Sequence, residues 1–451
     1  MTSVSCRVQA TGAEVRMTRT AGNAFATRTI VYGNRSVAVR NTGTGKEERY
    51  VLTKEDLRGI LSPLQPLRAI LSGNRIRLGP AVAIYALPFP GRNLFGPQTS
   101  MFEELASLFR EAACDMYVVT PGDLRPDGRS VEGYRHRAGK WVKEECPWPD
   151  FVWRRMTARP IAWVGRLDED ERRLAVSHTH IGTLPRSDND KWRVYQTLYE
   201  DPQSARYLPP TLVARTPIEA ARAIGRFDDV YIKPIRGTQG KQVMRARRVA
   251  GGFLFEPPAA AACGSAADPA RDVEELVRAL EKRMFKGQAY LIQETVALMR
   301  TLDGRPFDLR LLIQARASGE PVCTALIARI AQKKAITTNL HTGGVPLSAE
   351  RMASILAPAV RANYARGLNE ARTAAAAVFD ALRRMHPHMA ELGIDIALDA
   401  AGQARVLEVN PCPGRRMLRL IDPALRRMSL VRVVEYAVFS TGFGLSGTIL
   451  S

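Results

Sequence analysis

A chain of 451 residues with 45% hydrophobic and 24% charged positions can bury a large core and should divide into about two to four domains. Its formal net charge of +20 favours anionic partners, which include nucleotides, acidic peptides, nucleic acid and anionic surfaces. No apolar run approaches the roughly 20 residues of a membrane-spanning helix, and the six cysteines show neither zinc-site pairs nor disulfide density. These features exclude a membrane-spanning helix and a disulfide framework, and we expect a cytoplasmic protein.

The first segment, residues 1–78, alternates short apolar and polar stretches. Residues 29–32 and 36–39 show this alternation, and Gly33-Asn34 separates them. Such a pattern is typical of strands joined by tight turns. We therefore predict a small β-rich domain.

The second segment, residues 79–185, predicts a Rossmann-like domain. An apolar strand is expected at residues 81–87, an amphipathic helix follows, and a second strand is expected at residues 116–119. Residues 149–154 predict a further strand at the end of this βαβ-like unit. The helix is indicated by apolar residues at helical spacing, namely Met101, Leu105, Leu108, Phe109 and Ala112.

From residue 186 onward strands and helices alternate again. Asp268-Pro269 predicts an N-cap and first-turn proline for a helix with Val273, Leu276 and Leu280 on one face. A second helix is expected at about residues 372–385, where an alanine run has high helix propensity.

Residues 393–411 predict a β-hairpin that carries the most informative polar residues. If its turn is centred between Ala401 and Gly402, Asp395 lies directly across from Glu408, and both project from one face. Asn410 lies two residues beyond Glu408 and shares that face. Oxygen ligands of this kind suit Mg²⁺ with bound phosphates. The alternative is a solvent-facing hairpin decorated with acidic residues.

Residues 230–241 predict a strand that delivers Lys233 into a glycine-containing turn, Gly237-Thr238-Gln239-Gly240. Glycines allow backbone N–H groups to approach phosphate oxygens, and the lysine supplies a point charge. A plain turn is the alternative.

Two further segments add candidates for nucleotide contacts. Residues 289–296 form an apolar strand that ends in polar residues, an edge that can hydrogen-bond adenine and ribose. Arg310 and Arg329 lie on predicted interior strands, where burial is costly unless the arginines meet anions such as a γ-phosphate. A structural ion pair, with Asp308 as a partner, is the alternative.

Taken together and in this order, the segments resemble the ATP-grasp superfamily over about residues 190–415. The motifs similar to the ribosomal-protein glutamate ligase RimK are Gly237-Thr238-Gln239-Gly240, Gln293-Glu294, Asp308-Leu309-Arg310, residues 339–344 and Glu408-Val409-Asn410. Ala328-Arg329-Ile330 is also similar to bacterial glutathione synthetase. Where RimK-like loops carry a third glycine, this chain has Gln242.

Over its whole length the chain resembles the YheC/YheD family, which is associated with bacterial endospores. This narrower resemblance depends on Leu78-Gly79-Pro80, residues 149–152, Asp190-Lys191-Trp192, residues 208–211 and Lys233-Pro234. It implies an α/β (α+β) fold in which a two-lobed ATP-grasp domain, residues 186–451, follows the Rossmann-like pre-grasp domain and the β-rich domain.

The resemblance also implies a role for individual residues. Lys191 and Lys233 would bind the nucleotide, and Asp395, Glu408 and Asn410 would bind Mg²⁺, or alternatively Mn²⁺. The adenine hinge would be Gln293, Glu294, Thr295 and Val296, the phosphate loop Gly237, Thr238, Gln239 and Gly240, and the phosphate and substrate contacts Arg310, Arg329 and Asn339.

The leading functional hypothesis is an ATP-dependent ligase that phosphorylates a carboxylate, on a small molecule or a peptide, and passes the acyl group to an amine. The rival is a noncatalytic ATP-binding structural or assembly protein of the endospore coat, with spore-coat proteins as partners and a spore-associated location. Nucleic-acid binding is a third class that the +20 charge alone suggests, because no recognisable nucleic-acid motif is present.

Overall fold

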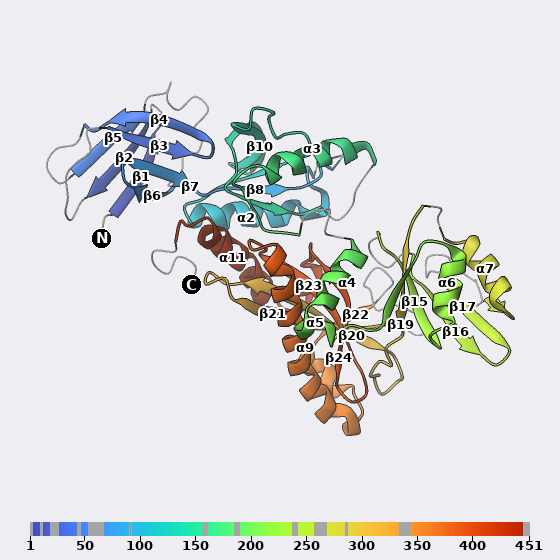
Figure 1. The fold of residues 1–451 in the computed structure, drawn as a ribbon. Coiled ribbons are helices and arrows are strands. Elements are labelled where there is room, and N and C mark those ends of the chain that lie inside the picture. Colours follow the sequence, from blue (N-terminus) through green and yellow to red (C-terminus); the bar gives the residue numbers. More distant parts are fainter. Residues whose placement is uncertain are drawn as a thin grey trace.

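The computed structural model describes residues 3–9, 12–18, 27–42, 47–52, 67–89, 91, 93–156, 161–184, 190–236, 242–256, 268–284, 287–332 and 344–444. These residues form five β-sheets. Figure 1 shows the N-terminal sheets at one end of the molecule, the sheet of β15, β16 and β17 at the other, and the C-terminal sheet between them. Within the described part of the chain, no helix has the length and apolar character needed to cross a bilayer.

Two small sheets form the N-terminal part. Strand β3 (Thr27–Tyr32) pairs with β4 (Arg35–Arg40) through a turn in which Gly33 has a φ of +57°, which confirms the predicted hairpin. A side chain at Gly33 would collide with the backbone of Trp148, so this turn packs on the next sheet. The other strands of the two sheets are β1 (Ser3–Gln9), β2 (Gly12–Thr18), β5 (Glu47–Leu52), β6 (Arg68–Ser72) and β7 (Arg75–Gly79).

A six-stranded sheet follows, in the order β11-β10-β9-β8-β12-β13. Strand β8 (Ala81–Tyr85), helix α2 (Thr99–Glu111) and strand β9 (Asp115–Val119) form the predicted parallel βαβ unit. The predicted strand at residues 149–154 is β12 (Phe151–Arg154), which pairs in parallel with the other side of β8. The connections leave β8 and β12 in opposite directions, so the carboxyl ends of these strands flank a topological switch point.

The remaining elements of this sheet were not predicted. The hairpin of β10 (Ser130–Arg137) and β11 (Lys140–Pro147) forms its antiparallel edge, and its strands carry many charged residues, as protected edges do. The others are η1 (Gly96–Gln98), η2 (Ile161–Trp163), α3 (Val164–Ala175) and β13 (His180–Ile181).

The third large sheet is antiparallel and has helices α6 (Pro217–Ile224) and α7 (Val273–Glu281) in its core. The predicted helix start at Asp268 is wrong. Asp268–Ala270 is strand β18, and the side chain of Asp272 caps α7 by accepting from the backbone N–H of Glu275. The other strands are β14 (Thr211–Ala214), β15 (Asp229–Pro234), β16 (Met244–Val249), β17 (Gly252–Glu256) and β19 (Tyr290–Glu294).

The C-terminal sheet is antiparallel and packs one face on helix α9 (Pro358–Met385), which contains the helix predicted at residues 372–385. The absence of a side chain at Gly367 allows α9 to approach the sheet, since a β-carbon there would lie 2.8 Å from Leu398. The strands, in spatial order, are β22 (Val345–Ser348), β21 (Pro321–Ile330), β20 (Phe307–Ala315), β23 (Glu391–Leu398) and β24 (Ala404–Asn410).

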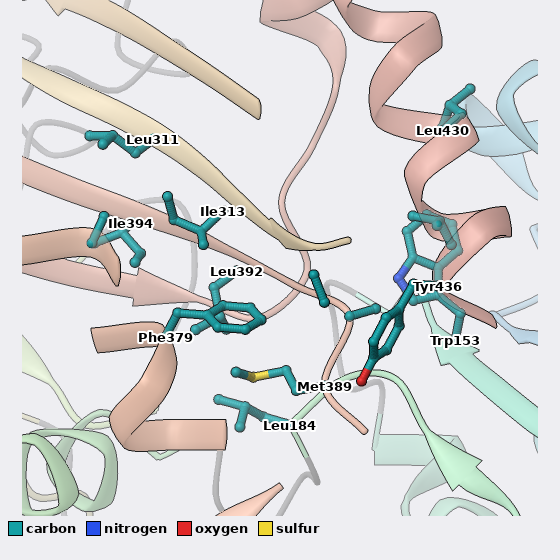
Figure 2. Packing of buried hydrophobic residues seen from close by; sticks show 14 of the residues in the cluster. Trp153, Leu184, Leu311, Ile313, Phe379, Met389, Leu392, Ile394, Leu430 and Tyr436 are labelled. Carbon is teal, nitrogen blue, oxygen red and sulfur yellow. The ribbon is translucent and has the colours of Figure 1, made fainter. Parts of the chain in front are cut away.

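A continuous hydrophobic core joins the second sheet to the C-terminal sheet. Figure 2 shows Trp153 of β12 and Leu184 near Leu392 of β23 and Tyr436 of α11. The two sheets therefore have no solvent layer between them at this point. The helices not yet named are α4 (Lys191–Glu200), α5 (Pro202–Ala205), α8 (Ala349–Ser354), α10 (Arg416–Ile421) and α11 (Pro423–Ser440).

Candidate nucleotide and metal site

One face of the C-terminal sheet gathers the polar residues that the sequence singled out. Asp308 pairs with Arg329 between β20 and β21, and Arg310 pairs with Asp395 between β20 and β23. Directly paired residues of an antiparallel sheet project from the same face. Glu408 pairs with Asp395 and brings β24 onto this face, which we call the polar face.

The predicted pairing of Asp395 with Glu408 is confirmed, although the hairpin reaches it by another path. Near the turn, Leu398 pairs with Ala404 and Ile396 with Val406, a register one residue short of the prediction. A β-bulge between Asp395 and Ile396 then restores the missing residue. Without the bulge, Glu408 would point to the opposite face of the sheet.

Asp395 is the centre of a buried ion-pair network. Arg310 donates to both of its oxygens, with 2.9 Å between Nη2 and Oδ2. Arg329 Nη2 lies 3.0 Å from Asp395 Oδ2 and 2.6 Å from Asp308 Oδ2, so it bridges two carboxylates. Burial raises the pKa of Asp395, but the two arginines outweigh burial and hold that pKa at about 2. The ion-pair alternative considered for these arginines is therefore present in the structure, with Asp395 as a second partner.

The two predicted lysines meet beside the polar face. Asp190 caps the first turn of α4, which places Lys191 at the start of the helix with its Nζ 3.2 Å from Glu408 Oε1. Lys233 comes from β15, and its Nζ donates to Gln293 Oε1 at 2.6 Å and to the carbonyl of Leu407 at 3.4 Å. Two lysines from one sheet and one helix thus converge on the hairpin that carries Glu408.

Burial changes the proton affinity of Lys233. Loss of water contact lowers its pKa from 10.5 to about 8, and repulsion by Lys191 adds to this effect while Glu408 opposes it. Counted together, four cations (Lys191, Lys233, Arg310, Arg329) face three carboxylates (Asp308, Asp395, Glu408). One positive charge is left over, which favours an anion.

An apolar cavity of about 530 Å³, including its opening, lies between the lysines and β24. This volume is within the roughly 300–1,000 Å³ typical of small-molecule sites. Gln293 is the polar residue of the predicted hinge that lines it. The apolar walls, which sequence analysis missed, are Val194, Tyr195, Leu198, Leu208, Leu291, Val406, Leu407 and Val409.

The rest of the predicted hinge has other contacts. The backbone N–H of Glu294 donates to the carbonyl of Pro210, and that of Thr295 donates to the carbonyl of Asp229. The Thr295 hydroxyl also donates to the Asp229 carboxylate at 2.8 Å. Val296 follows the strand end and does not line the cavity. Gly237, Thr238, Gln239, Gly240 and Asn339 lie outside the described residues.

The oxygen donors on the polar face fit a hard cation such as Mg²⁺. Glu408 Oε2 has no hydrogen-bond partner within the described residues, and Asn410 Oδ1 accepts one hydrogen bond, from the N–H of Cys412. Asp395 accepts three of the about four bonds that a carboxylate can take. In the described part of the chain no three His, Cys, Asp or Glu residues form a metal cluster, so Asn410 would have to supply the third donor.

Comparison with known proteins decides the family. Residues 184–439 match a family model described as YheC/D like ATP-grasp. The chain belongs to the YheC/D-like ATP-grasp family. This confirms the resemblance and the α/β ATP-grasp fold expected from the sequence. A relative of this YheC/D-like chain is the endospore coat-associated protein YheD of Bacillus subtilis (strain 168), which is 27% identical over 412 residues, 87% of this chain and 86% of the relative.

Solved structures with a similar fold are ATP-grasp enzymes. The YheC/D-like chain resembles a RiPP-associated ATP-grasp ligase of Chryseobacterium gregarium, solved with ADP and a leader and core peptide, with a TM-score of 0.42 and 13% identity over 79% of this chain and 95% of that one. It also resembles D-alanyl-alanine synthetase A of Vibrio cholerae O1 biovar eltor, with a TM-score of 0.43 and 13% identity over 79% and 98% of the two chains.

Proposed function

We propose that this protein is an Mg-ATP-dependent carboxylate–amine ligase that acts through an acyl phosphate. One observation carries the proposal: Lys191 and Lys233 meet Glu408 at an apolar cavity, beside a polar face on which Arg310, Arg329 and Asp395 converge. The adenine would occupy the cavity, and the phosphates would extend over the polar face. The domain division at residues 78 and 185 forms part of this proposal.

The chain's own residues would act by position and charge. Lys191 and Lys233 would hold the phosphates, and Asp395, Glu408 and Asn410 would hold a divalent cation that neutralises phosphate charge when bound. A substrate carboxylate oxygen attacks the γ-phosphorus, and the bond to the β–γ bridging oxygen breaks, which releases ADP. Arg310 and Arg329 would stabilise the negative charge on the transferred phosphoryl group.

In the second step the amine nitrogen attacks the acyl carbon. The carbon–oxygen bond to phosphate breaks, phosphate leaves, and the nitrogen loses its proton to solvent. No enzyme nucleophile is needed, so positioning and charge neutralisation supply the catalysis.

Hydroxylamine trapping tests this proposal, because hydroxylamine converts an acyl phosphate into a stable hydroxamate. Purified protein with Mg-ATP and a panel of carboxylates should release ADP and form a hydroxamate in equal amounts with its substrate. ADP release without hydroxamate for every carboxylate would argue against acyl transfer.

The second candidate is a noncatalytic ATP-binding protein of the endospore coat. The coat-associated name of the relative favours it, and so does Asp395, whose oxygens the chain's own arginines already occupy. Glu408→Gln separates the candidates in a spore-forming host. A ligase variant should lose product formation and coat function together, whereas an assembly protein should keep coat association and function.

A further inference from the structure

The inference concerns a hollow next to the polar face, and it depends on the ligase proposal. Beyond Arg310, the same sheet face becomes apolar through Leu312, Ala325 and Ile327. Helix α10 covers these residues with Met417 and Leu418, and the loop before it contributes Pro413 and Gly414. The enclosed hollow has a volume of about 270 Å³ including its opening. It is too small for a second nucleotide and suits a single side chain.

Arg310 gives this hollow a polar end. Its Nε and Nη2 donate to Asp395, whereas its Nη1 has no hydrogen-bond partner within the described residues. The Arg310 side chain is 15% exposed and lines the hollow. A side chain that enters can therefore place a carboxylate on Nη1 and methylene groups against Leu312 and Ile327.

The loop that forms the hollow has a fixed position. Gly393 lies beneath Pro413, and a β-carbon at Gly393 would be 2.9 Å from the Pro413 ring. From the second sheet, buried Arg155 donates to the Pro413 carbonyl at 3.1 Å, and buried Arg415 shares Glu391 with Arg155. The hollow is therefore a built feature of the interface between the two sheets.

The surface outside the hollow is basic and apolar. On the side of α10 away from Met417 and Leu418, Arg416, Arg419 and Leu420 are exposed, and Arg427 and Met428 are exposed on α11. No acidic side chain of the described residues forms a salt bridge with these three arginines. The exposed large apolar residues here are aliphatic, whereas a single-stranded nucleic acid needs aromatic rings for base stacking.

We propose that the ligase's carboxylate substrate is an acidic polypeptide. A glutamate or aspartate side chain enters the hollow with its carboxylate on Arg310, and neighbouring acidic residues bind Arg416, Arg419 and Arg427. Apolar residues between them contact Leu420 and Met428. The chain's net charge of +20 has the sign that such a partner requires.

Binding is measured with three labelled probes by fluorescence anisotropy: a peptide that alternates glutamate with leucine, its glutamine counterpart, and an oligothymidylate. We expect the glutamate peptide alone to bind well, with an affinity that falls as salt rises. The double variant R416E/R419E should bind it about tenfold more weakly, because two favourable contacts become repulsive. The matched variant R222E/R226E, which reverses two exposed arginines on and after α6, should bind as the wild type does.

A second pair of variants tests the hollow itself. A β-carbon at Gly414 meets no atom within 4 Å, so Gly414→Leu should fold and obstruct the hollow. It should lose peptide-stimulated ADP release while it still binds Mg-ADP. Gly165→Leu on α3, where a β-carbon also meets nothing, should keep both.

The outcomes separate this inference from the ligase proposal. Tighter binding of oligothymidylate than of the glutamate peptide, or an equal loss of affinity in R416E/R419E and R222E/R226E, would overturn the acidic-polypeptide inference. Normal peptide stimulation in Gly414→Leu would overturn the role of the hollow. If wild-type protein bound no Mg-ADP, the proposed function itself would fail.

Discussion

Arg310 and Asp395 face each other across strands β20 and β23, and the guanidinium of Arg310 donates from Nε and Nη2 to both carboxylate oxygens. The pair is almost fully buried, and Arg329 approaches the same carboxylate from the other side. A buried carboxylate shared by two arginines keeps both cations in place before any ligand arrives. It also means that the carboxylate cannot be removed without leaving charge unpaired.

Asp395→Asn should therefore lower the free energy of unfolding by about 3 kcal/mol, since breaking one side of a buried ion pair leaves a buried charge. Urea denaturation measures this value. Asp303→Asn, at an exposed carboxylate paired with Arg305, serves as the control and should leave the urea midpoint unchanged. Unchanged stability in Asp395→Asn would show that the network does not hold the sheet face together.

The same network predicts a response to acid. Because the folded-state pKa of Asp395 is about 2, below the roughly 3.9 of a free aspartate, its contribution to stability is complete above pH ~4 and is lost as the pH falls toward 2. The stability difference between wild type and Asp395→Asn should therefore shrink over this range. A constant difference down to pH 2 would contradict the assigned pKa.

Nucleotide binding should take up a proton near pH 8. Lys233 has a pKa of about 8 in the free protein, and nearby phosphates would raise it, so roughly half of the molecules must bind a proton at that pH. Titration calorimetry in buffers of different ionisation enthalpy measures this uptake. It should vanish in Lys233→Arg and persist in Lys140→Arg, at an exposed lysine of β11. Equal uptake in both variants would assign the proton to another group.

Before any nucleotide binds, the sign of the Lys233 effect on stability is opposite to that of Asp395. The unfolded chain holds the Lys233 proton up to about pH 10.4, whereas the folded chain releases it near pH 8. The contribution of Lys233 to stability should thus rise between these values, relative to Lys233→Arg.

Metal and nucleotide should bind interdependently. Glu408 pairs with Lys191, and a cation on Glu408 would release the lysine to the phosphates. We expect ADP to bind at least about tenfold more tightly with Mg²⁺ than with EDTA, measured by calorimetry. Glu408→Gln should reduce this ratio toward one, and Glu200→Gln, at an exposed residue of α4, should keep it. A ratio unaffected by Glu408→Gln would place the metal elsewhere.

The turn of the β23–β24 hairpin should be sensitive to a single methyl group. Gly402 has a φ of +78°, and a β-carbon there would lie 2.2 Å from the carbonyl oxygen of Asn363 on α9. Gly139, in the β10–β11 turn, has a φ of +77° and nothing within 4 Å. Both alanine variants carry the backbone strain, but Gly402→Ala adds a collision. It should therefore lose about 1–3 kcal/mol more stability than Gly139→Ala. Equal losses would show that α9 yields at no cost.

Local patterns predicted the residues on the polar face, and long-range pairing decided their contacts. Alternation along residues 393–411 was sufficient to pair Asp395 with Glu408, yet the bulge that preserves this pairing has no signal in the sequence. Asp308 was a predictable partner of Arg329. The bond between Arg310 and Asp395 depends on the pairing of β20 with β23, two strands that are distant in sequence.

The cavity walls show the same limit. Tyr195, Leu198 and Leu208 lie before β15, whereas Val406 and Leu407 belong to β24. Each would serve equally well in any hydrophobic core, and only the tertiary fold brings them together beside Lys233. The wrong helix start at Asp268 has a more local cause, because Asp272 offers the same capping group in a position that leaves Pro269 in a strand.

The central claim is that a divalent cation with a nucleotide binds on the polar face. Crystals grown with Mn²⁺ and a nonhydrolysable ATP analogue test it through the anomalous scattering of manganese. The account predicts one or more manganese peaks within coordination distance of Glu408 and Asn410, with the adenine in the cavity beside Lys233. Ordered nucleotide elsewhere on the protein, or manganese with no oxygen of Asp395, Glu408 or Asn410 in contact, would contradict it.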